Sequence, residues 1–394
     1  MRSFQSWILH AHLLRLQDTM HGVTHGLVRG LDRTVAGLRK GADDLADTDR
    51  FSQLLIHSDD AQAHARIGGQ SPDHPRELHA WWSALSDADK DAVYRRNPSI
   101  ANRNGIPHAD RDHYNRRTLD ARLSETIATA DTTATKNYLK IKKALQQPSG
   151  TPRRYLSMLG PRFRVAIAAN NPDLSPHVVT FAVGAGVNPI TGVVHGVHQR
   201  LWRAAKSVDP HAEAAIVVWS GGEGPATVPH AIDSRFARQG APLLRAFQYG
   251  LRVTHHGQRS HNTVIGYSYG SLTAGFAARD GLDADDLVFL GSGGVGVAHT
   301  TELELTGVDP ADIGKHVYST VAEYDWIKLM PHPHGPLPTS PEFGATVFTT
   351  DSTRGPWNSL GWNYSDHFAY LTHLDNRAMK NLGLVITGLG HLVT

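Results

Sequence analysis

The chain has 394 residues, of which 40% are hydrophobic and 19% are charged, and its formal net charge is +2. This composition is that of a globular protein and the length suggests more than one structural unit, while a charge so near zero argues against nucleic acid or an anionic membrane surface as the main partner. The absence of cysteine excludes disulfides, thiol catalysis and zinc–thiolate sites and leaves the redox compartment open.

The first part of the chain, residues 1–75, is predicted to be helical. Apolar residues recur at spacings of three and four, as in an amphipathic helix, in the series Val23, Leu27, Leu31, Val35 and Leu38. We expect these helices to pack on the rest of the protein, and a helix pair that binds a protein partner is the alternative. Residues 1–18 lack the features of a secretory signal, and no apolar run reaches membrane-spanning length. The cytoplasm is therefore the default localisation, with export by a route that reads no such signal as the other option.

A second helical segment is expected over residues 76–160. A polar stretch, 57–76, contains Gly-Gly and two prolines and is predicted to be a linker. Ser86, followed three residues later by Asp89, predicts the start of a helix. A long helix is expected from about Ala109 to Leu145. We expect this segment to pack on a core formed by residues 161–394.

From Arg164 onward, short β-rich runs alternate with helical ones. The β-rich runs cover residues 165–168, 178–183, 215–219, 263–266, 287–290, 317–321 and 345–348. Strands that alternate with helices predict a doubly wound, mostly parallel sheet covered on both faces. Such sheets bind their ligands at the carboxyl ends of the strands.

The run at 263–266 leads into the pattern G-x-S-x-G, centred on Ser268 and followed by a helix of small residues. A buried strand, a tight turn and a helix are the context of a nucleophile elbow. The turn strains the serine backbone and leaves room only for small neighbours, a need that Gly266 and Gly270 meet. The helix directs its free N–H groups toward the serine oxygen. The pattern predicts Ser268 as a nucleophile, and a serine in an ordinary β–α turn is the alternative.

A serine nucleophile needs a base and an acid that orients the base, and in doubly wound hydrolases the acid and then the histidine follow the serine in the chain. Asp325 follows the run at 317–321 and is the predicted acid, with Glu323 and Asp351 as alternatives. His367 is the predicted base, and its alternatives are His373, His332 and His334.

Two backbone N–H groups are needed to bind the oxyanion. We expect them from Tyr269, directly after the nucleophile, and from Ala185, in the loop after the run at 178–183. Further residues near these strand ends are expected to line an apolar acyl pocket, namely Gly184, Tyr267, Ser292, Gly293, Trp326 and Phe368.

Two other patterns compete with this interpretation. Residues 291–296 match G-x-G-x-x-G, but a dinucleotide site also needs a helix that opens at the glycines and an acid about twenty residues on. A glycine-rich loop beside the pocket fits the sequence better. The pairs His195/His198 and His332/His334 lack a third ligand at metal-binding spacing. We therefore expect neither a cofactor nor a metal.

Taken in order, these motifs resemble an actinobacterial α/β-hydrolase family catalogued as a domain of unknown function. The resemblance covers about residues 81–388 and rests on Trp81-Trp82, Asn97-Pro98, Asn104–Pro107, Trp219–Gly221, the TVIGYSYGS elbow, the GSGGVG loop, Asp325, Phe343–Ala345 and the segment His367–Tyr370. It implies an α/β-hydrolase fold and a Ser268–Asp325–His367 triad, and it supplies no substrate. This chain departs from the family in having Tyr267 where histidine is usual and Gly294 where proline is usual.

The sequence therefore predicts a serine hydrolase of the α/β-hydrolase fold with a helical N-terminal region. It would cleave a small-molecule or lipid-like carboxylic ester through an acyl-enzyme, as esterases and lipases do. The alternative is a secreted or cell-surface binding protein on the same scaffold, with the N-terminal helices as its interface.

Overall fold

A computed structural model describes residues 71–184, 192–225, 228–352, 363, 365–371 and 374–394, which lie in one compact unit, Ser71–Thr394. The predicted N-terminal helices, up to residue 70, lie outside the described residues. The other two predicted segments, 76–160 and 161–394, both lie within this unit. Within the described ranges, no helix has the length and apolar character needed to cross a membrane.

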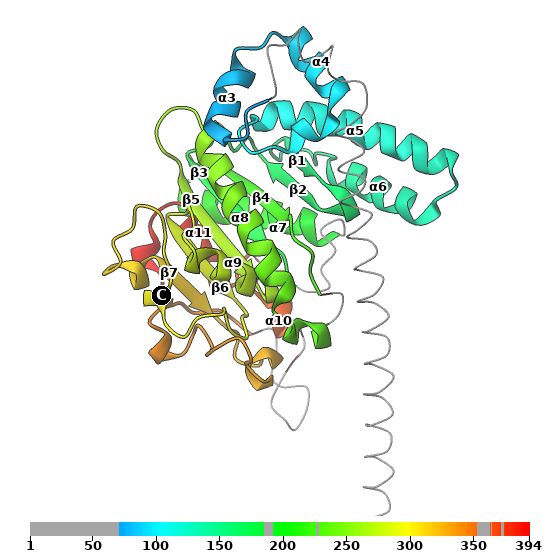
Figure 1. The fold of residues 1–394 in the computed structure, drawn as a ribbon. Coiled ribbons are helices and arrows are strands. Elements are labelled where there is room, and N and C mark those ends of the chain that lie inside the picture. Colours follow the sequence, from blue (N-terminus) through cyan, green and yellow to red (C-terminus); the bar gives the residue numbers. More distant parts are fainter. Residues whose placement is uncertain (1–70, 185–191, 226–227, 353–362, 364, 372–373) are drawn as a thin grey trace, which may run out of the picture. The chain divides into compact units, whose positions relative to one another are not determined.

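Eight strands form one sheet with helices on both faces (Figure 1). The strands are β1 (Arg154–Leu159), β2 (Val165–Ala169), β3 (His177–Ala182), β4 (Ala214–Ser220), β5 (His261–Tyr267), β6 (Asp286–Leu290), β7 (Val317–Thr320) and β8 (Thr346–Val347). Their spatial order is β1-β2-β4-β3-β5-β6-β7-β8. β2 is antiparallel to both of its neighbours, and the pairs from β4 through β8 are parallel. The predicted doubly wound, mostly parallel sheet is confirmed.

Two pairs of helices enclose the centre of the sheet. The described helices are α3 (Pro75–Ser83), α4 (Asp87–Arg96), α5 (His108–Ala128), α6 (Thr132–Ala144), α7 (Gly192–Val208), α8 (Arg235–Thr254), α9 (Tyr269–Arg279), α10 (Asp366–Ala369) and α11 (Arg377–Ile386). Leu244 of α8 and Leu272 of α9 pack on one face, and Leu201 of α7 and Leu382 of α11 on the other. Burial of these apolar faces is the main force that holds the layers together.

Strand register brings three loops to one edge of the sheet. Tyr267, the last residue of β5, pairs with Leu290, the last residue of β6, which in turn pairs with Thr320 at the end of β7. Because the three strands are parallel, the segments that follow them emerge side by side. Those segments contain Ser268, the glycine-rich loop and Asp325, so the fold alone brings distant parts of the chain to one place.

The helical segment before the core differs from the prediction in two respects. The single helix expected from Ala109 to Leu145 is wrong: α5 ends at Ala128 and α6 begins at Thr132. Ala130 has a φ of 57°, which breaks the helix, and the Asp131 side chain accepts from the Ala134 N–H to start the next one.

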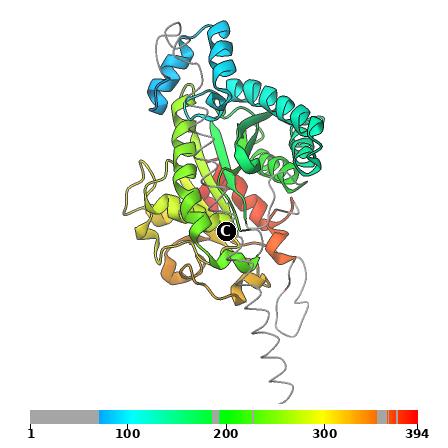
Figure 2. The same ribbon diagram turned by 45° about the vertical axis from the view of Figure 1, so that its right-hand side comes forward.

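The second difference is β1, which is absent from the predicted strands because Arg154 and Ser157 occupy buried positions in it and obscure its apolar pattern. α5 and α6 lie beside this edge of the sheet (Figure 2). The buried Asp112 carboxylate of α5 accepts from the Leu156 N–H of β1 at 2.7 Å and binds Arg116 and Arg153. The predicted helix start at Ser86 is confirmed, since its Oγ accepts from the Asp89 N–H.

Candidate active site

Ser268 occupies the turn between β5 and α9. Its φ of 53° and ψ of −123° are rare for a residue with a side chain, and such strain costs about 1–3 kcal/mol. The surrounding bonds hold the turn: the Ser268 N–H donates to Leu290 O at 2.9 Å, and its carbonyl accepts from the Ser271 N–H at 3.0 Å. The strand, strained turn and helix that the sequence predicted are all present.

The two elbow glycines are required by close backbone contacts. A Cβ on Gly266 would lie 2.5 Å from Ser271 Cα, and a Cβ on Gly270 would collide with Ala182 O of β3. Both obstacles belong to the backbone, so neither can move aside as the end of a side chain could. Small residues are therefore needed at positions 266 and 270, as expected, because a Cβ at either position would collide with the backbone.

We expect Gly270→Ala to lower the free energy of unfolding by about 2 kcal/mol, because the added methyl group must displace Ala182 in the middle of the sheet. Urea denaturation monitored by circular dichroism measures this loss. Gly224→Ala is the matched control, since a Cβ there meets nothing within 4 Å, and its effect should stay within about 0.5 kcal/mol. Equal stability of the two variants would show that the elbow tolerates a larger residue.

His367 and Asp325 reach the serine from two other segments. His367 lies on α10, and its Nε2 is 2.9 Å from Ser268 Oγ. Its Nδ1 is 2.9 Å from Asp325 Oδ2 and 3.1 Å from Oδ1. Because a carboxylate only accepts, Nδ1 carries the proton and Nε2 is left as an acceptor for the serine hydroxyl. The structure thus joins the three residues that the sequence singled out by order and position.

The Asp325 carboxylate is buried and receives two more donors. Ile327 N–H donates to Oδ1 at 2.9 Å, and the Tyr370 hydroxyl donates to Oδ2 at 2.5 Å while it accepts from the Ala322 N–H. Burial and the charge of Asp325 raise the pKa of Tyr370 well above its usual value, so its hydroxyl keeps its proton. These bonds fix both carboxylate oxygens, and no pattern in the sequence indicates this role for Tyr370.

Aromatic side chains hold the imidazole of His367. The Trp326 ring centroid lies 5.1 Å from that of His367, and the Tyr267 centroid lies 5.4 Å from it. The Tyr267 hydroxyl also donates to His367 O at 2.7 Å. Tyr267 thus connects the elbow directly to the segment that carries His367.

The alternative acids and bases lie elsewhere. Asp351 binds Arg377 at the start of α11, and Glu323 is exposed. His332 Nε2 donates to Ile327 O and His334 Nε2 donates to Ala231 O, so neither contacts the serine through that nitrogen. The remaining alternative base, His373, is outside the described residues.

The glycine-rich loop follows β6, and no α-helix opens at its glycines. Gly291 has a φ of 55°, and a Cβ there would lie 2.9 Å from the Tyr370 ring and 3.2 Å from Asp325 Oδ2. Gly294 has a φ of 122°, and a Cβ there would lie 2.9 Å from the carbonyl carbon of His334. The loop therefore makes room for the acid and for the wall of the pocket.

Of the two residues expected to bind the oxyanion through their backbone N–H groups, the structure describes Tyr269. Tyr269 is the first residue of α9, where a backbone N–H has no acceptor within the helix. The Tyr269 side chain is held by a hydrogen bond, in which its hydroxyl donates to Asp233 O. Ala185 lies outside the described residues. Gly184, the residue before Ala185, lies close to the nucleophile: a Cβ added to Gly184 would lie 3.0 Å from Ser268 Cβ.

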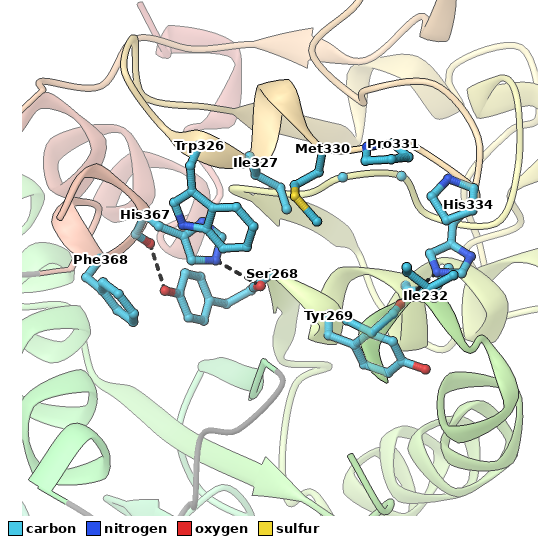
Figure 3. A pocket seen from close by; sticks show the side chains of 16 residues that line it. Ile232, Ser268, Tyr269, Trp326, Ile327, Met330, Pro331, His334, His367 and Phe368 are labelled. Atoms are coloured by element: carbon cyan, nitrogen blue, oxygen red, sulfur yellow. Dashed lines mark hydrogen bonds between the residues drawn. The ribbon is translucent and has the colours of Figure 1, made fainter. Parts of the chain in front are cut away.

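A pocket opens beside Ser268 (Figure 3). Four of the predicted lining residues border it, namely Tyr267, Gly293, Trp326 and Phe368. Gly184 and Ser292 are not among its lining residues; the Ser292 hydroxyl bonds to Gly294 within its own loop. Unpredicted lining residues come mainly from η3 (Val228–Ile232) and from η6 (Trp326–Leu329) with the loop after it: Ala231, Ile232, Ile327, Met330, Pro331, Pro333 and His334.

The histidine pairs do not gather into a metal site in the part of the chain that the structure describes, where no three His, Cys, Asp or Glu residues could hold an ion together. His198 is buried on α7, and its Nε2 donates to Ile167 O of β2 at 2.7 Å. The side chain of His195 is outside the described set.

Comparison with known proteins gives matches along much of the chain. The uncharacterized protein Rv2079 of Mycobacterium tuberculosis strain H37Rv is 27% identical over 376 residues, which cover 80% of this chain and 56% of Rv2079. This chain therefore spans little more than half the length of that relative. The uncharacterized protein Rv0963c of the same strain is 31% identical over 116 residues, which cover 28% of this chain and 42% of Rv0963c.

A solved structure, that of carboxyl esterase 2 from the mycorrhizal fungus Tuber melanosporum, is similar with a TM-score of 0.34 and 14% identity, over 60% of this chain and 85% of the esterase. Residues 166–334 match the model of a family described as alpha/beta hydrolase. That match includes Ser268 and Asp325. Together with the order and direction of the eight strands and the helices on both faces, it shows that this chain has an α/β-hydrolase fold.

Proposed function

We propose that this protein is a serine hydrolase that cleaves carboxylic esters. One observation carries the proposal: His367 lies between Ser268 Oγ, at 2.9 Å, and a buried carboxylate, also at 2.9 Å. A serine hydroxyl is a weak nucleophile until a base takes its proton, and the base needs a partner that fixes its tautomer. The two distances support the proposal that His367 is this base and Asp325 is this partner.

In the proposed reaction, Ser268 Oγ attacks the ester carbonyl carbon and its proton passes to His367 Nε2. The N–H groups of Tyr269 and Ala185 bind the oxyanion. The bond to the alcohol oxygen then breaks, and His367 gives that oxygen its proton. A water molecule attacks the acyl-enzyme, again with His367 as base, and the carboxylic acid leaves as Ser268 regains its proton.

An ester suits the described pocket better than a peptide. A peptide brings backbone N–H and C=O groups on both sides of the bond to be cut, and each must find a partner when it leaves water. The polar ends of Tyr267, Tyr269 and His334 are already bonded to backbone atoms of the protein itself. An ester makes no such demand beyond the carbonyl oxygen.

A fluorophosphonate tests the proposal, because an activated serine displaces its fluoride and keeps the phosphonyl group. We expect one adduct per chain, located on Ser268 by peptide mass spectrometry. His367→Ala should label at least about 10²-fold more slowly, since the base is gone. Ser271→Ala is the matched control, because the Ser271 hydroxyl bonds to Gly266 O and faces no substrate. An adduct on another residue, or none on the folded protein, would contradict the assignment.

A further inference from the structure

Among the described residues, those that line the pocket beside Ser268 offer a substrate few polar contacts. None of the described residues that line it is Asp, Glu, Lys or Arg. The Tyr269 hydroxyl donates to Asp233 O and accepts from the Ala237 N–H. The Tyr267 hydroxyl donates to His367 O, and His334 Nε2 donates to Ala231 O. A charged group placed here would lose its water without meeting an opposite charge among the described lining residues, and a sugar-like group would find few hydrogen-bond partners among them.

The apolar surface continues beyond the pocket on both sides of the serine. Figure 3 shows Phe368 and Trp326 on the side of His367, and Ile232 and His334 on the opposite side of Ser268. Ile232 is 57% exposed and Phe368 is 42% exposed, although both line the pocket. Leu329, next to the lining residue Met330, is 60% exposed. An apolar surface that extends outward from a pocket is typical of a site for an apolar ligand.

The position of His367 assigns the two sides to the two halves of an ester. In the proposed reaction His367 Nε2 must deliver its proton to the alcohol oxygen, so the alcohol lies on the side of His367 and Phe368. The acyl group then lies on the opposite side of Ser268. There, Ile327 and Met330 form one wall of the pocket and Ile232 forms the facing wall. At that end the His334–Ala231 hydrogen bond joins the two walls.

We propose that the substrate is an uncharged, lipid-like ester in which both the acyl chain and the alcohol are apolar, with the acyl chain over Ile232 and the alcohol over Phe368. This inference rests on the proposed function and adds to it the substrate class and the direction of binding. Each methylene group that leaves water on these surfaces stabilises the bound ester, so the rate should rise with the length of either half.

The test uses the full chain and two series of esters, each measured below its micelle-forming concentration. Nitrophenyl esters from acetate to decanoate vary the acyl half alone, and butyrate esters from methyl to octyl vary the alcohol alone. For the wild type we expect kcat/KM to rise about twofold to fourfold for each early methylene in both series. The slope of kcat/KM against chain length is the readout, because it is independent of the absolute rate of each variant.

Two variants separate the two halves. Ile232→Ser should flatten the acyl series and leave the slope of the alcohol series, whereas Phe368→Ser should flatten the alcohol series and leave that of the acyl series. Leu174→Ser is the matched control, since Leu174 is 62% exposed before β3, at the opposite end of that strand from the site, and both slopes should stay as in the wild type.

Three results would overturn the inference: a wild type with flat slopes, a preference for charged or sugar esters, or variants in which both slopes fall together. If fluorophosphonate labels Ser268 normally, these results contradict the inference alone and the proposed function stands. If the folded wild type neither labels at Ser268 nor cleaves any ester, the proposed function is wrong and the substrate class falls with it.

Discussion

Replacing Ser268 by alanine is expected to lower kcat/KM for a nitrophenyl ester by about 10⁴-fold or more. The substitution removes the atom that would form the acyl-enzyme and leaves His367 with no hydroxyl to deprotonate. The remaining Tyr269 N–H and the pocket still bind the ester, so a small residual rate over water is expected. Initial rates with purified wild type and variant, at ester concentrations well below KM, measure the ratio directly.

Stability gives this prediction a second, independent readout. Alanine keeps the Cβ at a φ of 53°, and therefore keeps the strain, whereas glycine adopts this φ freely. We expect Ser268→Gly to be as inactive as Ser268→Ala and more stable than it by about 1 kcal/mol in urea denaturation. The gain in stability therefore comes from relief of the backbone strain by glycine, and not from loss of the hydroxyl, which both variants lack.

Ser271→Ala controls for damage to the elbow. Ser271 is as buried as its neighbours and bonds to Gly266 O, so the variant should lose stability while kcat/KM stays within a few fold of the wild type. If Ser268→Ala kept more than about a tenth of the wild-type kcat/KM, another nucleophile would have to be sought.

The parts of the fold that repeat a local pattern could be predicted from the sequence. The run at 215–219 is apolar throughout because β4 is buried on both faces, and the same holds for the run at 287–290 in β6. The elbow was predictable because close backbone contacts require glycine at two fixed positions, between an apolar strand and a helix of small residues. Asp325 and His367 followed from the order in which strand ends must supply the acid and the base.

The parts that depend on distant contacts could not be predicted in this way. β1 carries Arg154 and Ser157 at buried positions, and the Leu156 N–H of β1 donates to Asp112 of α5. The pairing of β1 therefore depends on residues far away in the sequence and cannot be predicted from the residues of the strand alone. The pocket is lined by Ile232, at the end of the short 3₁₀ helix η3, and by Met330, directly after η6. Segments this short have no periodicity to indicate the side that faces the pocket.

The glycine-rich loop shows how tertiary contacts override a motif. Its spacing matches a dinucleotide site, yet Gly291 makes room for Tyr370 and Asp325, and Gly294 lies against the backbone at His334. At a φ of 122° Gly294 cannot be replaced by proline, whose ring fixes φ near −65°. The course of this loop therefore depends on a glycine at position 294.

Asp325→Asn is the second large effect that we expect, a fall in kcat of about 10⁴-fold with little change in KM. The hydrogen bonds around the acid supply the reason. Ile327 N–H donates to Oδ1, so the asparagine must keep its carbonyl oxygen on that side and turn its NH₂ group toward His367. His367 Nδ1 would then have to accept, which moves the imidazole proton to Nε2.

With the proton on Nε2, His367 donates to Ser268 instead of accepting from it, and the serine loses its base. The variant should fold normally, because Tyr370 can turn its hydroxyl to accept from the new NH₂ group. Equal melting temperatures for wild type and variant, together with slow fluorophosphonate labelling, would show that the activity is lost because His367 has the wrong tautomer. A variant that is both unstable and slow would point to loss of packing.

Two further substitutions provide values of kcat with which the effect of Asp325→Asn can be compared. Tyr370→Phe removes one donor to Asp325 and keeps the charge and the tautomer, so kcat should fall by only about tenfold, far less than for Asp325→Asn. Asp351→Asn is the matched control, an acid that the sequence also offered but that binds Arg377 at the start of α11. Its kcat should stay within about twofold of the wild type. If Asp351→Asn fell as far as Asp325→Asn, or if Asp325→Asn kept most of the activity, Asp325 would not be the residue that orients the base.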